Sequence, residues 1–316
     1  MAETRWRMLA VLFLARTALG FQFQTIASAA PFLREDLRIG FAEIGTLIGL
    51  YMLPGIALSL PGGFLVRRFG DKTLCCAGLG LMALGGMVTG MSDTYGTALV
   101  GRFISGTGSV FLSISITKMV TDWFAGREIV TAMSVLLTSW PLGIAAGLLL
   151  YAPLAEAQGW SWVMFVAAGA CLVGLILVAA LYRSPESATL TDAPTLSFAL
   201  PPRDETLPIL VAGLIWGVFN LALIVFFSFV PLLLAERSFS LAEGAFITSV
   251  VLWLMIGSMP VGGHWVQRTG KLDSAVVIFA TLTGLVMAAL PLMVSKLSRN
   301  ELDNLRSNDI RIPASP

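Results

Sequence analysis

Two long uncharged stretches, separated by a short basic loop, decide how this sequence can fold. Residues 44–66 read IGTLIGLYMLPGIALSLPGGFLV, residues 67–72 read RRFGDK, and residues 73–92 read TLCCAGLGLMALGGMVTGMS. A helix needs about 20 mostly apolar residues to cross the hydrocarbon core of a bilayer. The apolar residues do not alternate with polar ones, which indicates membrane helices rather than barrel strands. We therefore expect two membrane-crossing helices joined by a basic loop at one face.

The whole chain has the same composition. Of its 316 residues, 56% are hydrophobic and 12% are charged, and its mean hydropathy is +0.84. Soluble domains carry roughly 25% charged residues, so a soluble protein of this length would have a surface that it could not hydrate. The net charge of +1 gives no electrostatic footprint for nucleic acid. The composition predicts an all-α, polytopic helical bundle whose surroundings are the lipid bilayer, with no nucleic-acid partner.

Nine membrane spans are expected along the chain. Two of them contain one arginine each and extend from about Met8 to Phe32, around Arg16, and from about Gly96 to Thr117, around Arg102. The others have no charged residue and are 44–66, 73–92, 129–155, 157–182, 206–235, 244–267 and 274–295. Lysine and arginine are concentrated in alternate loops, which places the N-terminus in the cytoplasm. We expect an integral multi-pass protein of the cell (inner or plasma) membrane.

An internal repeat with an offset of 200 residues sets the domain organisation. The recurring residues are Ser28, Pro31, Leu33, Ala42, Glu43, Ile56, Gly62, Gly63, Val66, Arg68 and Gly70, each matched 200 positions later. The two copies begin six helices apart, as in transporters that are built from parallel repeats. We therefore expect a six-helix bundle over 1–182, a cytoplasmic linker over 183–205, a partial three-helix bundle over 206–295 and a polar tail over 296–316.

Three motifs resemble the major facilitator superfamily. They are the loop Gly63 to Lys72, the run Arg102-Phe103-Ile104-Ser105-Gly106, and Asp122-Trp123-Phe124 with Ser139-Trp140-Pro141-Leu142-Gly143. The last of these is similar to the cyanate and nitrate type permeases of that superfamily. Members of the superfamily have twelve helices, so the resemblance implies a chain that is truncated after the ninth helix.

The resemblance also implies a gating role for the basic loop. The matching residues are Gly63, Arg67, Arg68, Gly70, Asp71 and Lys72 in the first copy, with Gly263, Arg268 and Gly270 in the second. Gly63 permits a close approach of two helices, and Gly70 suits a helix C-terminus. Arg67 stands where the family has an aspartate, so a counter-charge must come from Asp71, Asp122 or Glu128. The alternative is that the basic side chains only anchor the loop at the inner face.

Two charges lie inside the expected spans and by default indicate function. In the family, spans one, four, seven and ten line a central cavity. The resemblance therefore implies that the cavity is lined by Arg16, Gln24, Arg102, Ser105, Ser109 and Asn220. Arg16 could instead extend to the cytoplasmic face, Arg102 could form a structural hydrogen bond, and the serines could only permit close helix packing.

The leading hypothesis is a secondary active transporter of a small organic or inorganic anion, which works by alternating access. Two guanidinium groups suit an anion because each offers planar, bidentate donors. A proton is a candidate coupling ion, and we expect a monomer. We expect no enzyme activity, no cofactor and no metal, since the three cysteines lack metal-ligand spacing and no Walker loop is present. The alternative is a truncated, transport-inactive or regulatory remnant.

Overall fold

In the part of the chain that the structure describes, every regular element is a helix, as the sequence predicts. The computed structural model describes residues 2–126, 128–185, 203–236 and 240–271, together with 274, 277, 278 and 281. The chain divides into a first unit, Met1–His264, and a second unit, Trp265–Pro316. The packing and the cavity described below belong to the first unit.

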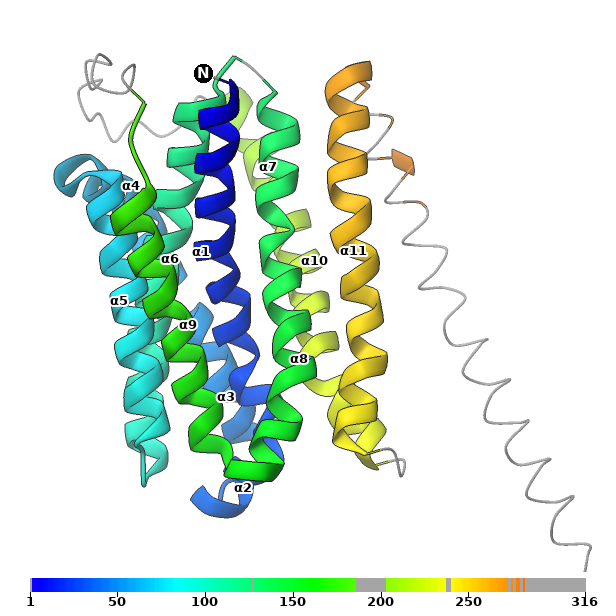
Figure 1. The fold of residues 1–316 in the computed structure, drawn as a ribbon. Helices are drawn as coiled ribbons and strands as arrows, with labels where there is room; N and C mark the ends of the chain where they lie inside the picture. The colour runs from blue at the N-terminus through cyan, green and yellow to red at the C-terminus, as the bar shows by residue number, and fades with distance from the viewer. Residues whose placement is uncertain are drawn as a thin grey trace, which may run out of the picture. The chain divides into compact units, whose positions relative to one another are not determined.

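Eleven helices follow one another along the described residues (Figure 1). They are α1 (Ala2–Ser28), α2 (Ala30–Leu37), α3 (Phe41–Met52), α4 (Pro54–Phe69), α5 (Asp71–Gly90), α6 (Tyr95–Phe124), α7 (Ile129–Leu137), α8 (Ser139–Gln158), α9 (Trp160–Leu181), α10 (Arg203–Glu236) and α11 (Leu241–Thr269). Eight helical segments are long and apolar enough to cross a membrane, and they correspond to the first eight expected spans. The ninth expected span, 274–295, and the tail 296–316 lie almost entirely outside the described residues.

Two of the expected spans are each broken into two helices. The second span divides into α3 and α4 at Leu53, directly before Pro54. The fifth span divides into α7 and α8 at Thr138, three residues before Pro141. Proline has no amide hydrogen, so Pro141 cannot donate to the carbonyl of Leu137 one turn earlier. The break therefore lies within one turn before Pro141.

The outer surface of the first unit is apolar. Ile56 on α4 is 82% exposed, and Ile176 on α9 is 61% exposed. Singly exposed apolar residues are normal in soluble proteins, but here they extend over most helices and indicate a lipid-facing surface. The apolar surface and the eight apolar helices together support an integral multi-pass membrane protein.

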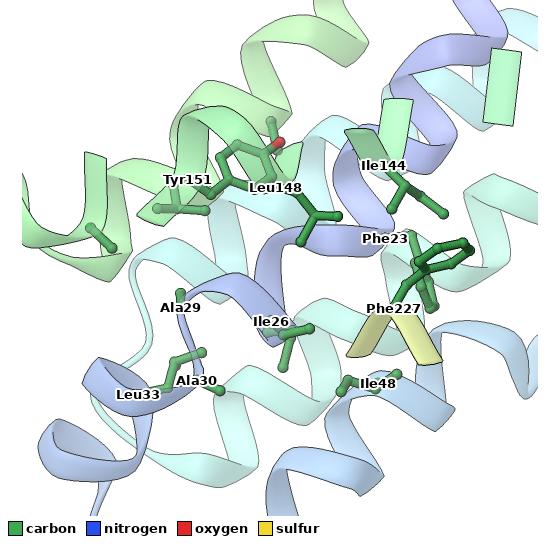
Figure 2. Packing of buried hydrophobic residues seen from close by; sticks show 14 of the residues in the cluster. Phe23, Ile26, Ala29, Ala30, Leu33, Ile48, Ile144, Leu148, Tyr151 and Phe227 are labelled. Carbon is green, nitrogen blue, oxygen red and sulfur yellow. The ribbon is translucent and has the colours of Figure 1, made fainter. Parts of the chain in front are cut away.

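Helix α1 lies at the centre of the packing, where it runs along α8 and α9. Figure 2 shows the apolar cluster beside it, in which Phe23 and Ile26 of α1 pack near Ile144 and Leu148 of α8 and Phe227 of α10. Gly143 allows α1 and α8 to come close, because a Cβ at this position would meet the carbonyl oxygen of Thr17. This contact sets the distance between the elements that carry the cavity.

The two copies of the repeat have the same local backbone geometry. The backbone N–H of Gly40 donates to Glu43 Oε2 at 3.0 Å, and that of Ser240 donates to Glu243 Oε2 at 2.8 Å. Each glutamate therefore caps the first turn of a helix, as its position in the sequence predicts. Gly70 and Gly270 both have a positive φ, 81° and 66°, and end α4 and α11 in the same way. The similarity extends to both ends of the repeated segment.

Candidate functional site

A cavity of about 460 Å³ lies within the first unit, between the six-helix segment and helices α10 and α11. Its wall is formed by residues of α1, α3, α4, α6, α7, α8, α10 and α11. Most of the wall is apolar, and Trp140, Trp216 and Phe219 contribute aromatic rings. Arg16 is the one charged side chain among the described residues that line it. The cavity therefore combines an apolar wall with a single guanidinium group.

Arg16 connects the cavity to the break in the fifth span. Its Nη1 donates to the carbonyl oxygen of Leu136 at 3.2 Å and to Ser139 Oγ at 3.0 Å. Leu136 and Ser139 flank the junction of α7 and α8 at Thr138, where a regular helical hydrogen bond is lost at Pro141. Among the described residues, Nε of Arg16 is buried and has no hydrogen-bond partner. The guanidinium therefore stabilises the junction with one nitrogen and retains unused donors.

Two further residues predicted from the sequence lie on the cavity wall with Arg16. Ser109 comes from α6, and Asn220 comes from α10. Ser109 Oγ donates to the carbonyl oxygen of Gly106 at 2.7 Å, and Asn220 Nδ2 donates to that of Trp216 at 2.8 Å. Both side chains thus donate to carbonyl oxygens of their own helices, and their oxygen atoms can still accept hydrogen bonds from a ligand. The fold brings together one member each from the first, fourth and seventh spans.

Arg102 lies away from the cavity wall, although it was expected to line the cavity. It is 1% exposed and donates through Nε to the carbonyl oxygen of Leu47 at 3.1 Å. Its Nη1 lies 3.4 Å from the carbonyl oxygen of Gln22, and its guanidinium lies over the ring of Tyr51 at 4.6 Å. The side chain is long enough to reach from α6 to α1 and α3. Arg102 therefore forms structural hydrogen bonds between helices, which was the alternative to a place on the cavity wall.

Ser105 and Gln24 also lie between helices and not among the residues that line the cavity. Ser105 Oγ accepts a hydrogen bond from Gln22 Nε2 at 3.0 Å and lies 3.4 Å from the carbonyl oxygen of Met82 on α5. Gln24 Nε2 lies 3.2 Å from Ser28 Oγ and 3.5 Å from the carbonyl oxygen of Phe227. The two serines of α6 that were expected to line the cavity therefore differ in position, because Ser105 packs against α5 while Ser109 lies on the cavity wall.

The aromatic residues of the wall were missed by the sequence analysis. Trp216 lies four residues before Asn220, so the two share one face of α10. That spacing could have predicted Trp216 once Asn220 was chosen. Trp140 directly precedes Pro141 in a motif that was noted only for its resemblance. Tyr51 lies on the cavity wall near the end of α3.

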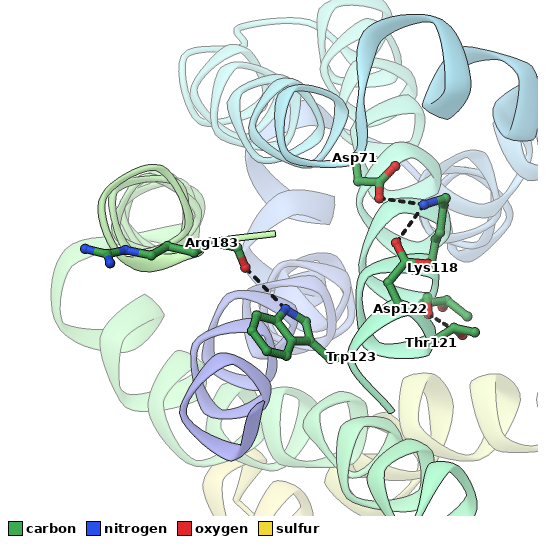
Figure 3. A network of polar contacts seen from close by, with 7 residues as sticks. Asp71, Lys118, Thr121, Asp122, Trp123 and Arg183 are labelled. Atoms are coloured by element: carbon green, nitrogen blue, oxygen red, sulfur yellow. Dashed lines mark hydrogen bonds and ion pairs between the residues drawn. The ribbon is translucent and has the colours of Figure 1, made fainter. Parts of the chain in front are cut away.

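Ion pairs connect helices at the end of the bundle that carries the basic loop. Lys118 Nζ on α6 lies 2.8 Å from Asp71 Oδ2 and 2.7 Å from Asp122 Oδ2, as Figure 3 shows. Arg5 Nη2 lies 2.8 Å from Glu128 Oε2, which joins the start of α1 to the start of α7. All three acids that were named as counter-charges are therefore in ion pairs with basic residues. The pairs of Lys118 with Asp71 and of Arg5 with Glu128 join helices of the six-helix segment to one another, whereas the pair with Asp122 lies within α6.

Two backbone contacts lie at the same end of the six-helix segment. Lys72 Nζ donates to the carbonyl oxygen of Tyr182 at 2.9 Å. Trp123 Nε1 donates to that of Arg183 at 3.2 Å, which Figure 3 also shows. Both contacts fix the chain directly after α9. Lys72 therefore has a structural partner here, in addition to any anchoring effect of its charge.

The close approach expected at Gly63 is not present. A Cβ at Gly63 would meet nothing within 4 Å, whereas a Cβ at Gly62 would meet the side chain of Ile114 on α6. In the second copy a Cβ at Gly263 would meet the side chain of Ser134 on α7. The reason is the rotation of α4, which turns Gly62 rather than Gly63 toward its neighbour.

Comparison with known proteins identifies the family. The family model described as Major Facilitator Superfamily matches residues 12–301. The chain therefore belongs to the major facilitator superfamily, which is made of membrane transporters and not of enzymes. A hexuronate transporter of Bacillus subtilis (strain 168) is 22% identical over 255 residues, which are 77% of this chain and 60% of that protein. A choline/ethanolamine transporter of Homo sapiens is 25% identical over 334 residues, which cover 94% of this chain and 61% of that protein.

The chain thus spans about three-fifths of the length of these two relatives. Among solved structures, a crystal structure of a D-xylose–proton symporter has a similar fold, with a TM-score of 0.61 at 13% identity. The match covers 83% of this chain and 69% of that chain. The superfamily that the motifs resembled is confirmed, and so is the helical-bundle fold.

Proposed function

We propose that this chain carries out secondary active transport of a small anion by alternating access. The observation that carries this proposal is the position of Arg16, which is the one charged side chain on the part of the cavity wall that the structure describes. A guanidinium group presents planar donors that match a carboxylate or another oxyanion. A charge inside a membrane protein is costly and is typical of a site that handles a charged solute. Ser109 and Asn220 are the polar residues that we assign to the same site.

The sign of the solute charge rests on Arg16 and not on the relatives. One relative is named for hexuronate, an anion, and another is named for choline and ethanolamine, which are cations. A positively charged group on the wall disfavours a cation by like-charge repulsion in a medium of low dielectric constant.

The sequence also suggests a subfamily. Because the runs Asp122 to Phe124 and Ser139 to Gly143 resemble the cyanate and nitrate type permeases, we propose that the chain belongs with them.

Alternating access is supported by where the cavity lies. Its wall includes α1, α3, α4, α6, α7 and α8 of the first half and α10 and α11 of the repeated segment. A site between two repeats can be exposed to either side when one repeat moves against the other. We propose that the N-terminus is cytoplasmic, that the protein acts as a monomer in the cell membrane, and that the basic loops at Arg67, Arg68 and Arg268 close the cytoplasmic side.

Uptake into proteoliposomes tests this function. We expect labelled organic anions to accumulate faster in vesicles that contain the protein than in empty vesicles, and labelled choline to enter both at the same rate. An imposed pH gradient tests the proton as the coupling ion. Equal uptake of every anion by protein-containing and empty vesicles would refute transport by this chain, and faster uptake of choline would refute the anion assignment.

A further inference from the structure

The guanidinium of Arg16 has donors that the protein does not use. Within the described part of the chain only Nη1 is hydrogen-bonded, to Leu136 and Ser139, and these two bonds hold the guanidinium in place. Among the described residues neither Nε, which is buried, nor Nη2 has a hydrogen-bond partner. A planar carboxylate has two acceptor oxygens and can bind two neighbouring donors of one guanidinium. The unused Nη2 therefore supplies donors for an oxyanion such as a carboxylate.

The rest of the wall indicates what the carboxylate is attached to. Trp140, Trp216 and Phe219 supply rings, and Met255 and Met259 supply flexible apolar side chains. Such a surface gains free energy by removing apolar ligand atoms from water. Methionine also adapts to ligands of irregular shape. A ligand that fills this cavity must therefore be largely apolar.

Hydroxyl-rich ligands find few donors here. Ser59, Ser109 and Asn220 line the cavity, but each donates to a carbonyl oxygen of its own helix, which leaves Ser113 as the one serine on the described wall without such a bond. A sugar acid carries more hydroxyl groups than these few polar side chains can pair with, and each hydroxyl group left without a partner costs free energy. A cavity of about 460 Å³ is within the roughly 300–1,000 Å³ range of small-molecule pockets and is much larger than an inorganic anion needs.

One cation on the wall also sets the charge of the ligand. Of the described residues that line the cavity Arg16 is the one that is charged, so a second carboxylate would enter an apolar environment without a counter-charge from them. An unpaired charge in such an environment is strongly unfavourable. We infer that the solute is an organic monocarboxylate with a compact apolar or aromatic body, bound through Arg16. This inference rests on the anion transport proposed above and narrows its substrate class.

Direct binding to the purified protein in detergent tests the inference without requiring transport. Four probes are compared: cyclohexanecarboxylate, its neutral carboxamide, glucuronate and nitrate. The first three contain a six-membered ring, and all except the carboxamide carry a negative charge. Cyclohexanecarboxylate and glucuronate differ mainly in hydroxyl groups, and the acid and the amide differ in charge. We expect cyclohexanecarboxylate to bind about tenfold or more tightly than each of the other three probes, on the basis of its buried apolar area and charged hydrogen bonds. Glucuronate, nitrate or the amide binding as tightly would overturn the inference.

Two variants locate the binding site. Arg16→Gln keeps a donor for the α7–α8 junction but removes the charge, and we expect it to weaken cyclohexanecarboxylate binding about 10- to 100-fold. Trp216→Ala removes a ring from a side chain that is already 60% exposed, and we expect about 2- to 10-fold weaker binding. Trp162→Ala, on α9 and 50% exposed, is the matched control and leaves binding unchanged. An unchanged affinity in both Arg16→Gln and Trp216→Ala contradicts this site.

The two proposals fail in different ways. If glucuronate both binds best and is taken up in a manner that depends on Arg16, the anion transporter stands and the apolar substrate class falls. If cyclohexanecarboxylate binds through Arg16 but no vesicle accumulates any anion, the substrate class stands and transport falls. Failure of all four probes to bind overturns the substrate class, and the uptake assay then decides separately on transport.

Discussion

Arg16 has two roles at the scale of the single residue. It stabilises the junction of α7 and α8 through Nη1, and it supplies the charge of the cavity wall. A ligand carboxylate and the junction of α7 and α8 therefore accept hydrogen bonds from different nitrogens of the same guanidinium group. The two roles can be separated by changing the acceptors instead of the arginine.

Ser139→Ala removes one of the two acceptors of Arg16. Ser139 Oγ also donates to the carbonyl oxygen of Leu136, 2.6 Å away, so this variant loses two bonds at the junction. We expect the free energy of unfolding to fall by about 1–2 kcal/mol, while carboxylate binding changes far less than in Arg16→Gln. Thermal unfolding in detergent, followed by binding of cyclohexanecarboxylate, measures both quantities. A variant with unchanged stability would show that the junction does not depend on this contact.

Arg102→Gln tests the residue that the structure places outside the cavity. The substitution removes a guanidinium that is 1% exposed and leaves the carbonyl oxygen of Leu47 or Gln22 with a poorer donor. We expect a loss of about 1–3 kcal/mol of stability, with the affinity of the folded protein for carboxylates within about twofold of the original. A large loss of affinity without a loss of stability would return Arg102 to the binding site.

Both intramembrane arginines could be predicted from the sequence, but their surroundings could not. Each arginine is a single charge in a long apolar run. The charge pattern alone does not distinguish the arginine on the cavity wall from the one between helices. Which one reaches the cavity depends on the rotation of α1 and α6 and on what lies opposite. Leu47 and Gln22 offer carbonyl oxygens to Arg102, and this contact between distant segments has no signature in the sequence.

At the scale of the element, close contact between α1 and α8 holds the cavity together. A Cβ at Gly143 would lie 2.6 Å from the backbone nitrogen of Phe21, so even alanine forces the two helices apart. We expect Gly143→Ala to destabilise the protein by about 1–3 kcal/mol. Gly169→Ala on α9 is the control, because its Cβ would meet nothing within 4 Å. Thermal midpoints of the two variants give the comparison, and equal midpoints would argue against the close packing.

The ion pairs of Lys118 connect α5 and α6 at the end with the basic loop. Lys118→Gln leaves Asp71 and Asp122 near each other without a cation between them. The side chain of Lys118 is 42% exposed, so solvent screening limits the expected destabilisation to about 1 kcal/mol. Arg7→Gln breaks an ion pair that is more than two-thirds exposed and serves as the control, with a smaller effect. Unfolding at low and high salt distinguishes the two, and a salt-independent loss in Lys118→Gln would contradict an electrostatic origin.

Element boundaries were predictable where the apolar runs end and less so within them. Proline alone does not predict a break, since Pro61, Pro153 and Pro260 lie inside α4, α8 and α11. The breaks at Leu53 and Thr138 have prolines nearby, but neighbouring helices decide whether a proline bends or breaks a helix. The capping glutamates were predictable because a capping box depends on residues only three positions apart.

At the scale of the whole molecule, the proposed orientation can be tested by chemical labelling. Ser184 follows α9, and Asp93 follows α5, so the two positions lie at opposite ends of the six-helix segment. After the three native cysteines are replaced by serine, single cysteines at these positions report their side. We expect Asp93→Cys to react with a membrane-impermeant maleimide on intact cells and Ser184→Cys to react only after lysis. The reverse pattern would place the N-terminus outside.

The central claim is that Arg16 holds the carboxylate of a transported solute. The most direct measurement is the initial rate of labelled cyclohexanecarboxylate uptake into proteoliposomes that contain the original protein, Arg16→Gln or Arg7→Gln at equal amounts. We predict that uptake by Arg16→Gln falls to the rate of empty vesicles, while Arg7→Gln keeps the original rate. Uptake by Arg16→Gln at the original rate, with the protein folded and correctly inserted, would contradict the claim.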